Sequence, residues 1–134
     1  MSGLVLKLGP RERIMVNGVV LENGDRRARI NILTPDAHVL RLRDAIHPTE
    51  ATTPVRRVCY IAQLALAGEA DPEEARRQIM RGVEQLSQVF TDPESRAHLT
   101  TATESAEARR FYQAMKALRN LLPRETRLLS VQAG

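Results

Sequence analysis

The stretch VLRLRDAIHPTEATTPVRRVCYIAQLAL, residues 39–66, decides the fold because its pattern changes from strand to helix part-way along. At its start Val39, Arg41 and Arg43 alternate with leucines, which predicts a strand over residues 38–42 with one buried and one wet face. Thr53-Pro54 then predicts a helix start, because Thr caps the helix and Pro suits its first position. We therefore predict an α+β fold, with strands before this stretch and helices after it.

Residues 1–45 have the pattern of short antiparallel strands, which occupy residues 4–8, 12–16, 19–21, 26–33 and 38–42. The pair Asn17-Gly18 is a strong signal for a two-residue hairpin turn, and Thr34-Pro35-Asp36 predicts a second turn. Along residues 26–33 apolar and polar side chains alternate, which places Arg27 and Arg29 on a wet face. We predict one small antiparallel sheet for this subdomain.

Two Asp-Pro-Glu sequences, at Asp71 and Asp92, repeat the helix-start chemistry, because Asp caps a helix, Pro suits its first position and acids suit its first turn. The helix after Asp71 has an apolar stripe formed by Ile79, Val83, Leu86 and Phe90. A weaker helix is predicted over residues 95–103, and a last one over residues 105–122 that Pro123 ends. We predict a bundle of three to four helices over residues 53–123 and a loose tail over residues 124–134.

Composition excludes several classes of protein. With 43% apolar and 27% charged residues, the chain can bury a core as one compact domain. No apolar run approaches the roughly 20 residues that a membrane helix needs, and the first residues show no signal-peptide pattern. We therefore expect a cytoplasmic protein with no membrane partner. The single cysteine, Cys59, lies in an apolar helical pattern, which favours a buried structural thiol over a reactive or metal-binding one.

The residue types that enzymes need do not form a recognisable set. His38, His47 and His98 lack metal-ligand spacing, and the chain has no phosphate-binding glycine loop and no nucleophile elbow. Most acidic residues already have a structural role at helix starts. Carboxylates that are distant in sequence can still meet in space, and the sequence leaves that open. We predict a binding protein with no catalytic residues, no cofactor and no metal site.

Basic residues on the strands are the candidate functional residues. The chain has 18 Arg, 2 Lys and a formal net charge of +4, and Arg suits both phosphates and base edges. Cationic grooves hold single-stranded RNA, although the strands carry no aromatic residue for stacking. Two alternatives stay open: Arg richness from genomic composition, and a solvated Arg face paired with Glu12, Glu22 and Asp25. The predicted RNA-binding residues are Lys7, Arg26, Arg27, Arg29, Arg41 and Arg43.

Part of the strand region resembles an RNA-binding family. Leu4-Val5-Leu6, Asn17-Gly18, Arg27-Ala28-Arg29-Ile30 and Thr34-Pro35-Asp36 occur in an order similar to that of the carbon storage regulator CsrA. That resemblance implies RNA contacts from the first strand and from the basic end of the last strand, which points to Lys7, Arg41 and Arg43. The chain departs from the family in that Asp44-Ala45 follows where the family has an acidic pair.

A second set of characteristic strings extends along the whole chain and covers residues 4–10, 22–27, Leu40–Pro48, Thr53–Gln63, Gln85–Pro93 and Tyr112–Leu118. In this order they resemble a second family, the flagellin-synthesis regulators FlbT of alphaproteobacteria. This resemblance implies a post-transcriptional repressor of flagellum biogenesis that binds the 5′ untranslated region of flagellin mRNA and promotes its degradation. It also implies action alongside a second flagellin regulator and contact with flagellin itself.

The helical half supports a second hypothesis, a protein-interaction module or chaperone-like regulator that binds flagellin or a partner regulator. An apolar groove on the helices would receive a partner helix, and the candidate residues are Leu64, Leu86, Leu121 and Leu122. The alternative is that the same leucines form ordinary helix–helix core. Because short helices and a small sheet bury a limited area, we also expect either a homodimer or a partner that covers one apolar helix face.

Overall fold

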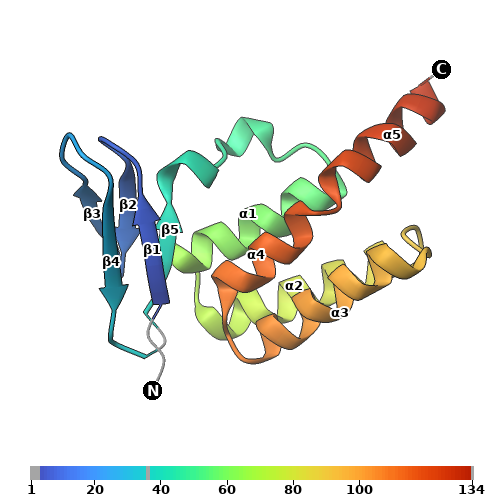
Figure 1. Ribbon diagram of the computed structural model, residues 1–134. Coiled ribbons are helices and arrows are strands. Elements are labelled where there is room, and N and C mark those ends of the chain that lie inside the picture. The colour runs from blue at the N-terminus through green and yellow to red at the C-terminus, as the bar shows by residue number, and fades with distance from the viewer. Residues whose placement is uncertain (1–3, 36, 134) are drawn as a thin grey trace.

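The computed structural model describes residues 4–35 and 37–133, with the strands at one end and the helices at the other (Figure 1). Its strands are β1 (Leu4–Leu8), β2 (Arg13–Val16), β3 (Val19–Glu22), β4 (Ala28–Ile32) and β5 (Val39–Arg41). Its α-helices are α1 (Pro54–Leu66), α2 (Pro72–Ser87), α3 (Pro93–Glu107), α4 (Phe111–Arg119) and α5 (Leu122–Ala133). Two short 3-10 helices, η1 (Leu42–Asp44) and η2 (Pro48–Glu50), connect β5 to α1. The predicted α+β class is confirmed, with one α-helix more than predicted.

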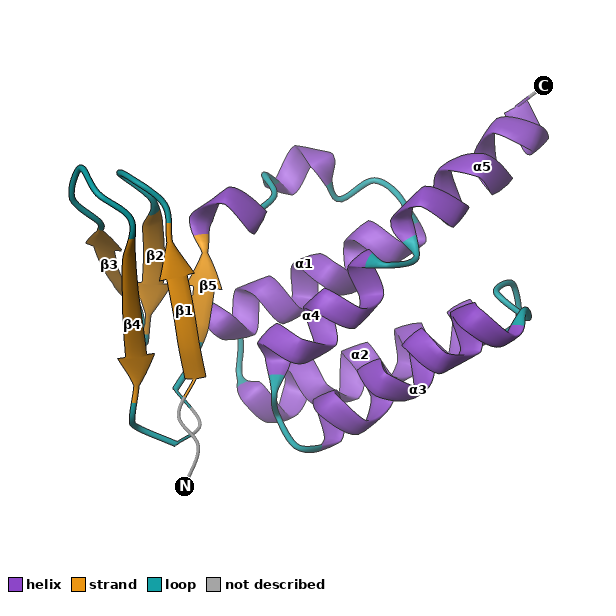
Figure 2. Ribbon diagram, in the orientation of Figure 1, coloured by secondary structure: helices purple, strands orange, loops and turns teal. Residues whose placement is uncertain are grey.

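The strands divide between two antiparallel sheets, whereas the sequence predicts one (Figure 2). β1 pairs with β4, while β3, β2 and β5 form the second sheet in that order. The chain changes sheet after β1, after β3 and after β4. After β3, the Asn23 side chain donates hydrogen bonds to the carbonyl oxygens of Gly9 (2.7 Å) and Arg26 (2.9 Å). One buried cluster joins the two sheets, and its members are Leu6, Leu8, Ile14 and Val39.

The turn between β2 and β3 is the hairpin that the sequence predicts at Asn17-Gly18. Both residues have positive φ, 48° for Asn17 and 84° for Gly18. A type I′ turn requires positive φ at both central positions, which Asn and Gly adopt at low cost. The other predicted turn, Thr34-Pro35-Asp36, includes Asp36, which lies outside the described residues.

β5 lies between two hydrophobic clusters and is covered on both faces. Val39 packs in the cluster between the sheets, whereas its neighbour Leu40 packs in the helical core. The strand ends at Arg41, so Arg43 lies in η1. The prediction of one buried and one wet face over residues 38–42 is therefore wrong, because a strand covered on both sides has no wet face.

The three predicted helix starts are confirmed. Thr53 Oγ1, Asp71 Oδ2 and Asp92 Oδ2 accept hydrogen bonds from the backbone N–H three residues further on, at 3.3, 3.0 and 3.0 Å. Each cap is followed by a proline in the first turn. These contacts satisfy donors that have no partner inside the helix, so local sequence alone predicts them.

α3 is longer than the sequence predicts, and the helix after it starts later. α3 continues to Glu107 instead of ending near residue 103, and α4 begins at Phe111 instead of near residue 105. The buried face of α3 includes the small residues Ser95, Ala102 and Ala106. Small side chains allow close helix packing but produce only a weak hydrophobic pattern, which explains the error in the prediction.

Pro123 does not end the helical part of the chain. It lies in the first turn of α5, where proline is tolerated, and residues 122–133 form a helix instead of the loose tail that was expected. Glu125 ties α5 to the start of α1: its Oε2 accepts a 2.8 Å hydrogen bond from the Val55 backbone N–H, and its Oε1 accepts one from the Thr53 hydroxyl. Glu125 and Val55 are 70 positions apart, so no local pattern predicts this contact.

Two expectations from composition can be compared with the structure. Cys59 is buried, as predicted, and its burial raises the pKa of the thiol to about 12, which keeps it protonated at neutral pH. Among the helices of the described residues, none has both the length and the apolar character that crossing a membrane requires.

Candidate nucleic-acid interface

Five of the six predicted RNA-binding residues line one open hollow in the sheet half, which is called the basic hollow below. Lys7 comes from β1, Arg29 from β4, Arg41 from β5 and Arg43 from η1, while Arg27 immediately precedes β4. The hollow has a volume of about 650 Å³, and its lining also includes Gly9, Pro10 and Glu12. Residues from separate strands therefore meet there, as the sequence predicts.

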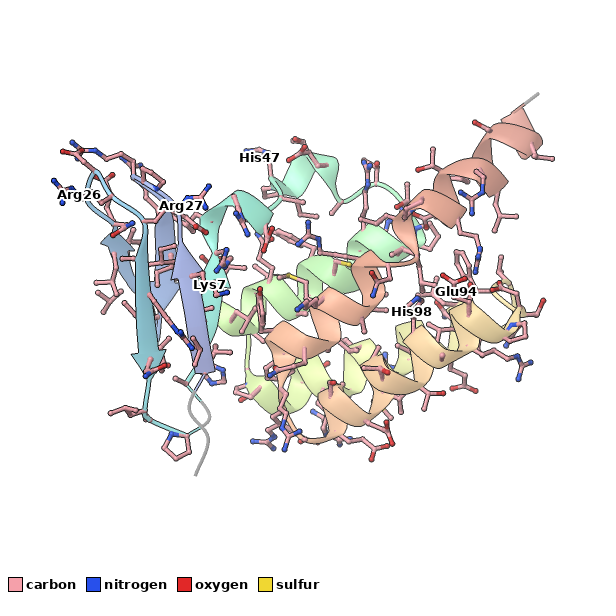
Figure 3. All side chains as sticks on the ribbon, viewed as in Figure 1. Lys7, Arg26, Arg27, His47, Glu94 and His98 are labelled. Carbon is pink, nitrogen blue, oxygen red and sulfur yellow. The ribbon has the colours of Figure 1, made fainter. Side chains whose placement is uncertain are left out.

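The strand pairing explains why these cations gather. In the antiparallel register of β1 and β4, Lys7 lies opposite Arg29. The Arg41 guanidinium donates a 2.7 Å hydrogen bond to the Lys7 carbonyl oxygen, which brings β5 to the same edge. Arg26 differs, because it is exposed in the connection before β4 and does not line the hollow. Figure 3 shows Arg26 and Arg27 near one end of the strands and Lys7 closer to the helices.

Arg41 has a different environment from the one predicted for it. Its side chain is only 11% exposed, and its Nη1 lies 3.2 Å from Glu12 Oε2. The face of β5 that carries Val39 and Arg41 points toward the other sheet, which explains the burial. The prediction that Arg41 lies on an exposed face is wrong, and its contacts indicate a residue that joins the two sheets.

Among the residues that the structure describes, Glu12 is the one carboxylate that lines the basic hollow. Its side chain is 8% exposed, and its Oε1 accepts a 3.0 Å hydrogen bond from the Gly9 backbone N–H. Its Oε2 lies 3.7 Å from Arg43 Nε as well as close to Arg41, but accepts no well-aligned hydrogen bond within the described residues. Arg43 stays largely exposed, so it can contact a ligand while it remains close to Glu12.

Lys7, Arg27 and Arg29 are exposed, and no carboxylate oxygen of the described residues lies within 4.0 Å of their charged atoms. The alternative of a fully paired Arg face holds only in part. Glu22 pairs with Arg13 at 2.8 Å and Asp25 pairs with Arg11 at 2.7 Å, both away from the hollow. Hydrogen bonding from Arg13 lowers the pKa of Glu22, so this carboxylate is ionised and already matched by its own cation.

The helical half carries a second surface feature, an apolar groove of about 630 Å³ between α1, α2 and α5. It is called the helical groove below. Its apolar lining includes Val89, Leu128 and Leu129, which are 61%, 37% and 40% exposed. Arg57 and Arg81 also line it. Sequence reasoning missed the two α5 leucines because that segment was expected to be a loose tail.

Of the four leucines predicted to form such a groove, only Leu86 lines it. Leu121 belongs to the helical core, and Leu122 packs against that core. Leu64 is half-buried outside the groove. Leu86 is itself buried in the helical core, so the alternative of ordinary helix packing describes both Leu86 and Leu121.

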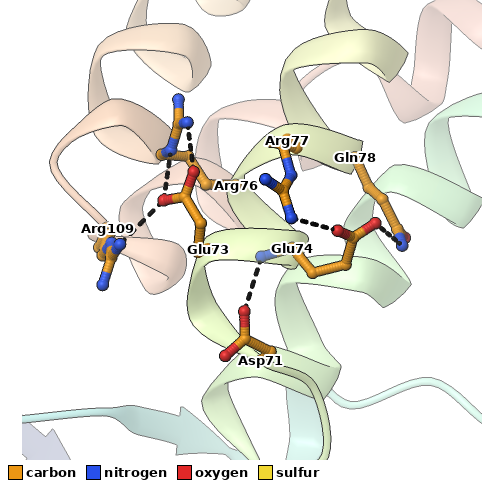
Figure 4. Close-up of polar contacts among 7 residues, drawn as sticks. All are labelled: Asp71, Glu73, Glu74, Arg76, Arg77, Gln78 and Arg109. Atoms are coloured by element: carbon orange, nitrogen blue, oxygen red, sulfur yellow. Dashed lines mark hydrogen bonds and ion pairs between the residues drawn. The ribbon is translucent and has the colours of Figure 1, made fainter.

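Acidic residues at the start of α2 are occupied by structural contacts (Figure 4). Glu73 accepts hydrogen bonds from Arg76 at 2.6 Å and from Arg109 at 2.8 Å, while Glu74 pairs with Arg77 at 2.7 Å. Hydrogen bonding from Arg76 and then Arg109 lowers the pKa of Glu73 to about 2. In the part of the chain that the structure describes, no three His, Cys, Asp or Glu side chains gather as metal ligands.

The family model for "Flagellar protein FlbT" matches residues 4–129, which is nearly the whole chain. The chain belongs to the FlbT family. The match includes both the basic hollow and the part of α5 that lines the helical groove.

Named relatives in the FlbT family agree with this assignment. The probable flagellum biosynthesis repressor protein FlbT of Caulobacter sp. (strain K31) is 31% identical over 126 residues, covering 94% of this chain and 95% of the relative. That of Mesorhizobium japonicum is 32% identical over 126 residues, covering 94% and 84%. The flagellum biosynthesis repressor protein FlbT of Caulobacter vibrioides is 30% identical over 132 residues, covering 98% and 93%. These names describe repressors of flagellum biosynthesis. No solved structure matches the chain.

On this FlbT-family scaffold the basic hollow has the chemistry of a phosphate-binding surface. Guanidinium and ammonium groups without carboxylate partners bind phosphate oxygens through charge-assisted hydrogen bonds. The aromatic residues Tyr60, Phe90, Phe111 and Tyr112 all lie in the helical half. A ligand in the hollow would therefore be held through its backbone charge, with Arg side chains as the available stacking groups.

Proposed function

We propose that this protein is a repressor of flagellum biogenesis that binds the 5′ untranslated region of flagellin mRNA in the basic hollow and promotes degradation of that mRNA. The observation that carries the proposal is the gathering of Lys7, Arg27 and Arg29, exposed and without carboxylate partners in the described residues. The names of the relatives support the regulatory role. The exposed cations of the hollow support a phosphate-bearing ligand, and the resemblance to FlbT regulators points to flagellin mRNA as that ligand.

The proposal divides the six predicted residues by role. Lys7, Arg27 and Arg29 contact RNA phosphates directly, and Arg43 contacts them from the η1 side of the hollow. Arg41 acts as a positioning residue, because its guanidinium is held by Glu12 and by the Lys7 carbonyl oxygen. Arg26 extends the surface beyond the hollow and is expected to contribute least.

The salt dependence of RNA binding tests the proposal. Each phosphate contact to a single strand contributes about 0.7 to the slope of log affinity against log salt. The triple variant Lys7→Ala/Arg27→Ala/Arg29→Ala should therefore lower that slope by about 2 when binding to a flagellin leader RNA is measured. A scrambled RNA of equal length measures how much of the affinity depends on sequence, because phosphate contacts alone carry none.

A matched control removes the same charges from the helical half. Arg56, Lys116 and Arg127 are exposed there, and Arg56→Ala/Lys116→Ala/Arg127→Ala changes the net charge equally. The proposal requires the first triple variant to lose affinity and slope while the control variant retains both. Equal losses in the two variants would show that general charge, and not the hollow, binds RNA.

The helical groove favours a second candidate function, binding of flagellin or of a second flagellin regulator. An apolar groove between helices suits one apolar face of a partner helix. The substitution Leu129→Asp should abolish copurification with flagellin, whereas Val131→Asp, at a 78% exposed position outside the groove, should not. If both variants retain flagellin equally, the groove is not its binding site.

A further inference from the structure

β3 is an edge strand whose apolar side chains are exposed. It pairs with β2 on one side only among the described strands. Val19, Val20 and Leu21 are 59%, 53% and 45% exposed. Successive strand residues point to opposite faces, so both faces of β3 present apolar surface to solvent. A strand with this composition is usually buried, so this edge is a candidate for pairing with another strand.

The free backbone groups of β3 can be assigned from its pairing with β2. The Asn23 backbone N–H donates to the Glu12 carbonyl oxygen at 2.8 Å, one position beyond the Arg13–Glu22 pair. Hydrogen-bonded and non-hydrogen-bonded pairs alternate in an antiparallel ladder, so Leu21 and Val19 bond to β2. The N–H and C=O groups of Val20 and Glu22 therefore point outward from the sheet edge.

β3 is a short strand of four residues and carries Glu22, but it lacks the other devices that protect a sheet edge. Such edges normally carry a lysine, a proline or a bulge, or are covered by another segment. The sequence Val19-Val20-Leu21-Glu22 contains neither lysine nor proline, and its pairing with β2 is continuous. The charge of Glu22 is matched by Arg13 at 2.8 Å and Arg11 at 3.5 Å within the same chain. Two such edges can therefore approach each other without uncompensated like charge.

We propose that β3 pairs with β3 of a second copy of this chain, antiparallel about a two-fold axis at Leu21, so that two three-stranded sheets become one continuous sheet. In this register Val20 of each copy exchanges backbone hydrogen bonds with Glu22 of the other. Leu21 then faces its own counterpart at a non-hydrogen-bonded position, where side chains lie closest. The identical edge is self-complementary, as a two-fold interface requires.

The alternative two-fold axis, at Val20, fits less well. It would place Glu22 opposite Gly18, whose φ of 84° belongs to the turn and not to an extended strand. With this axis, only the hydrogen-bonded pair between Val20 and Val20 of the other copy could form inside the strands. The axis at Leu21 keeps both hydrogen-bonded pairs within Val19–Glu22.

The contact between two β3 strands is small. Four residues from each strand bury less than the roughly 1,200 Å² of a stable complex, so we expect a dimer that dissociates in the micromolar range. No residue of β3 lines the basic hollow, so both hollows stay open in the dimer. The dimer therefore does not depend on the proposed RNA binding and can be tested without RNA.

Sedimentation of the full chain over a wide protein concentration range tests whether the β3 edge forms a dimer. The wild type should convert from monomer to dimer, and Leu21→Lys should remain monomeric. The control Val5→Lys places the same charge at a 44% exposed position on β1 and should dimerise as the wild type does. A wild type that is monomeric at every concentration, or a Leu21→Lys variant that dimerises unchanged, overturns the proposal. If the wild type is monomeric at every concentration, the β3 edge stays available to a strand of another protein.

Disulfide trapping tests the register. Leu21→Cys should form a disulfide-linked dimer under mild oxidation, because facing residues at this type of position have Cβ atoms about 4.5–5.5 Å apart. Val19→Cys should remain monomeric, because it faces a different residue in the other copy. The natural Cys59 is buried and does not compete. Failure of Leu21→Cys to link, in a variant that melts like the wild type, contradicts the two-fold axis.

Discussion

The sheet half and the helical half of the molecule are each tied together by one buried charged side chain that the sequence presents as a surface residue. In the sheet half Arg41 joins the two sheets through Glu12 and the Lys7 carbonyl oxygen. In the helical half Glu125 joins α5 to the start of α1. The difference lies in what each half leaves exposed: cations around the basic hollow in one, apolar side chains along the helical groove in the other. Buried charged residues that stabilise the fold must therefore be distinguished from exposed charged residues that can contact a ligand.

The largest expected effect comes from removing Arg41. Arg41→Ala leaves the Glu12 carboxylate nearly buried without its closest cation, which should lower the free energy of unfolding by about 3 kcal/mol. Arg29→Ala, at an exposed position where no described carboxylate oxygen lies within 4.0 Å, should change the free energy of unfolding by less than about 0.5 kcal/mol. Urea unfolding of both variants measures the difference. Equal stability of the two would mean that Arg41 is not structural.

Removing the anchor of α5 should have the next largest effect. Glu125→Ala deletes an acceptor for the Val55 backbone N–H and the Thr53 hydroxyl, so the free energy of unfolding should fall by about 2 kcal/mol. Amide hydrogen exchange should also become faster in α5 while α2 and α3 change little. The exposed Glu69 offers a control, because Glu69→Ala removes the same charge from a loop. If α5 exchanges at wild-type rates in Glu125→Ala, other contacts hold that helix.

A smaller effect is expected at Gly82, where α1 and α2 come close together. A Cβ at this position would lie 2.5 Å from Val58 Cγ2, and the branched valine has little freedom to move away. The overpacking outweighs the gain in helix propensity, so Gly82→Ala should destabilise the protein by about 1 kcal/mol. Val58→Ala removes the valine methyl groups from this contact, so Gly82→Ala should lower the stability less in that background than in the wild type. A Gly82→Ala variant that melts above the wild type would contradict the close approach.

The smallest effect concerns pH. The pKa of Glu73 is lowered from 4.5 to about 2 by Arg76 and Arg109, so this carboxylate binds its proton less readily in the folded state. Its contribution to stability is present above pH 4.5 and is lost as the pH falls toward 2. Glu73→Gln should therefore reduce the change in melting temperature over this window. Identical acid titrations of variant and wild type would show that the Glu73 contacts do not stabilise the fold.

Local sequence predicts the parts of this fold that local interactions determine. The strand residues, the Asn17-Gly18 turn and the caps at Thr53, Asp71 and Asp92 depend on neighbours a few positions away, and all are present. The alternation in β4 also places Arg29 on the exposed side, as predicted. These features follow from backbone chemistry that each segment carries by itself.

The remaining features depend on contacts between distant segments. Whether β5 has a wet face depends on the helices that cover Leu40 and on the other sheet, which covers Val39 and leaves the Arg41 side chain only 11% exposed. Whether residues 122–133 form a docked helix depends on Glu125 reaching the start of α1. The candidate site was therefore predicted as a set of cations, while the division of roles between Arg41 and its neighbours required the structure.

NMR of the arginine side-chain Nε–Hε groups during titration with flagellin leader RNA tests the central distinction most directly. We expect the signals of Arg27 and Arg29 to shift first and furthest, while those of Arg56 and Arg127 in the helical half stay unchanged. The reverse pattern, with Arg27 and Arg29 unaffected by saturating RNA, would contradict the assignment of the basic hollow as the RNA-binding site.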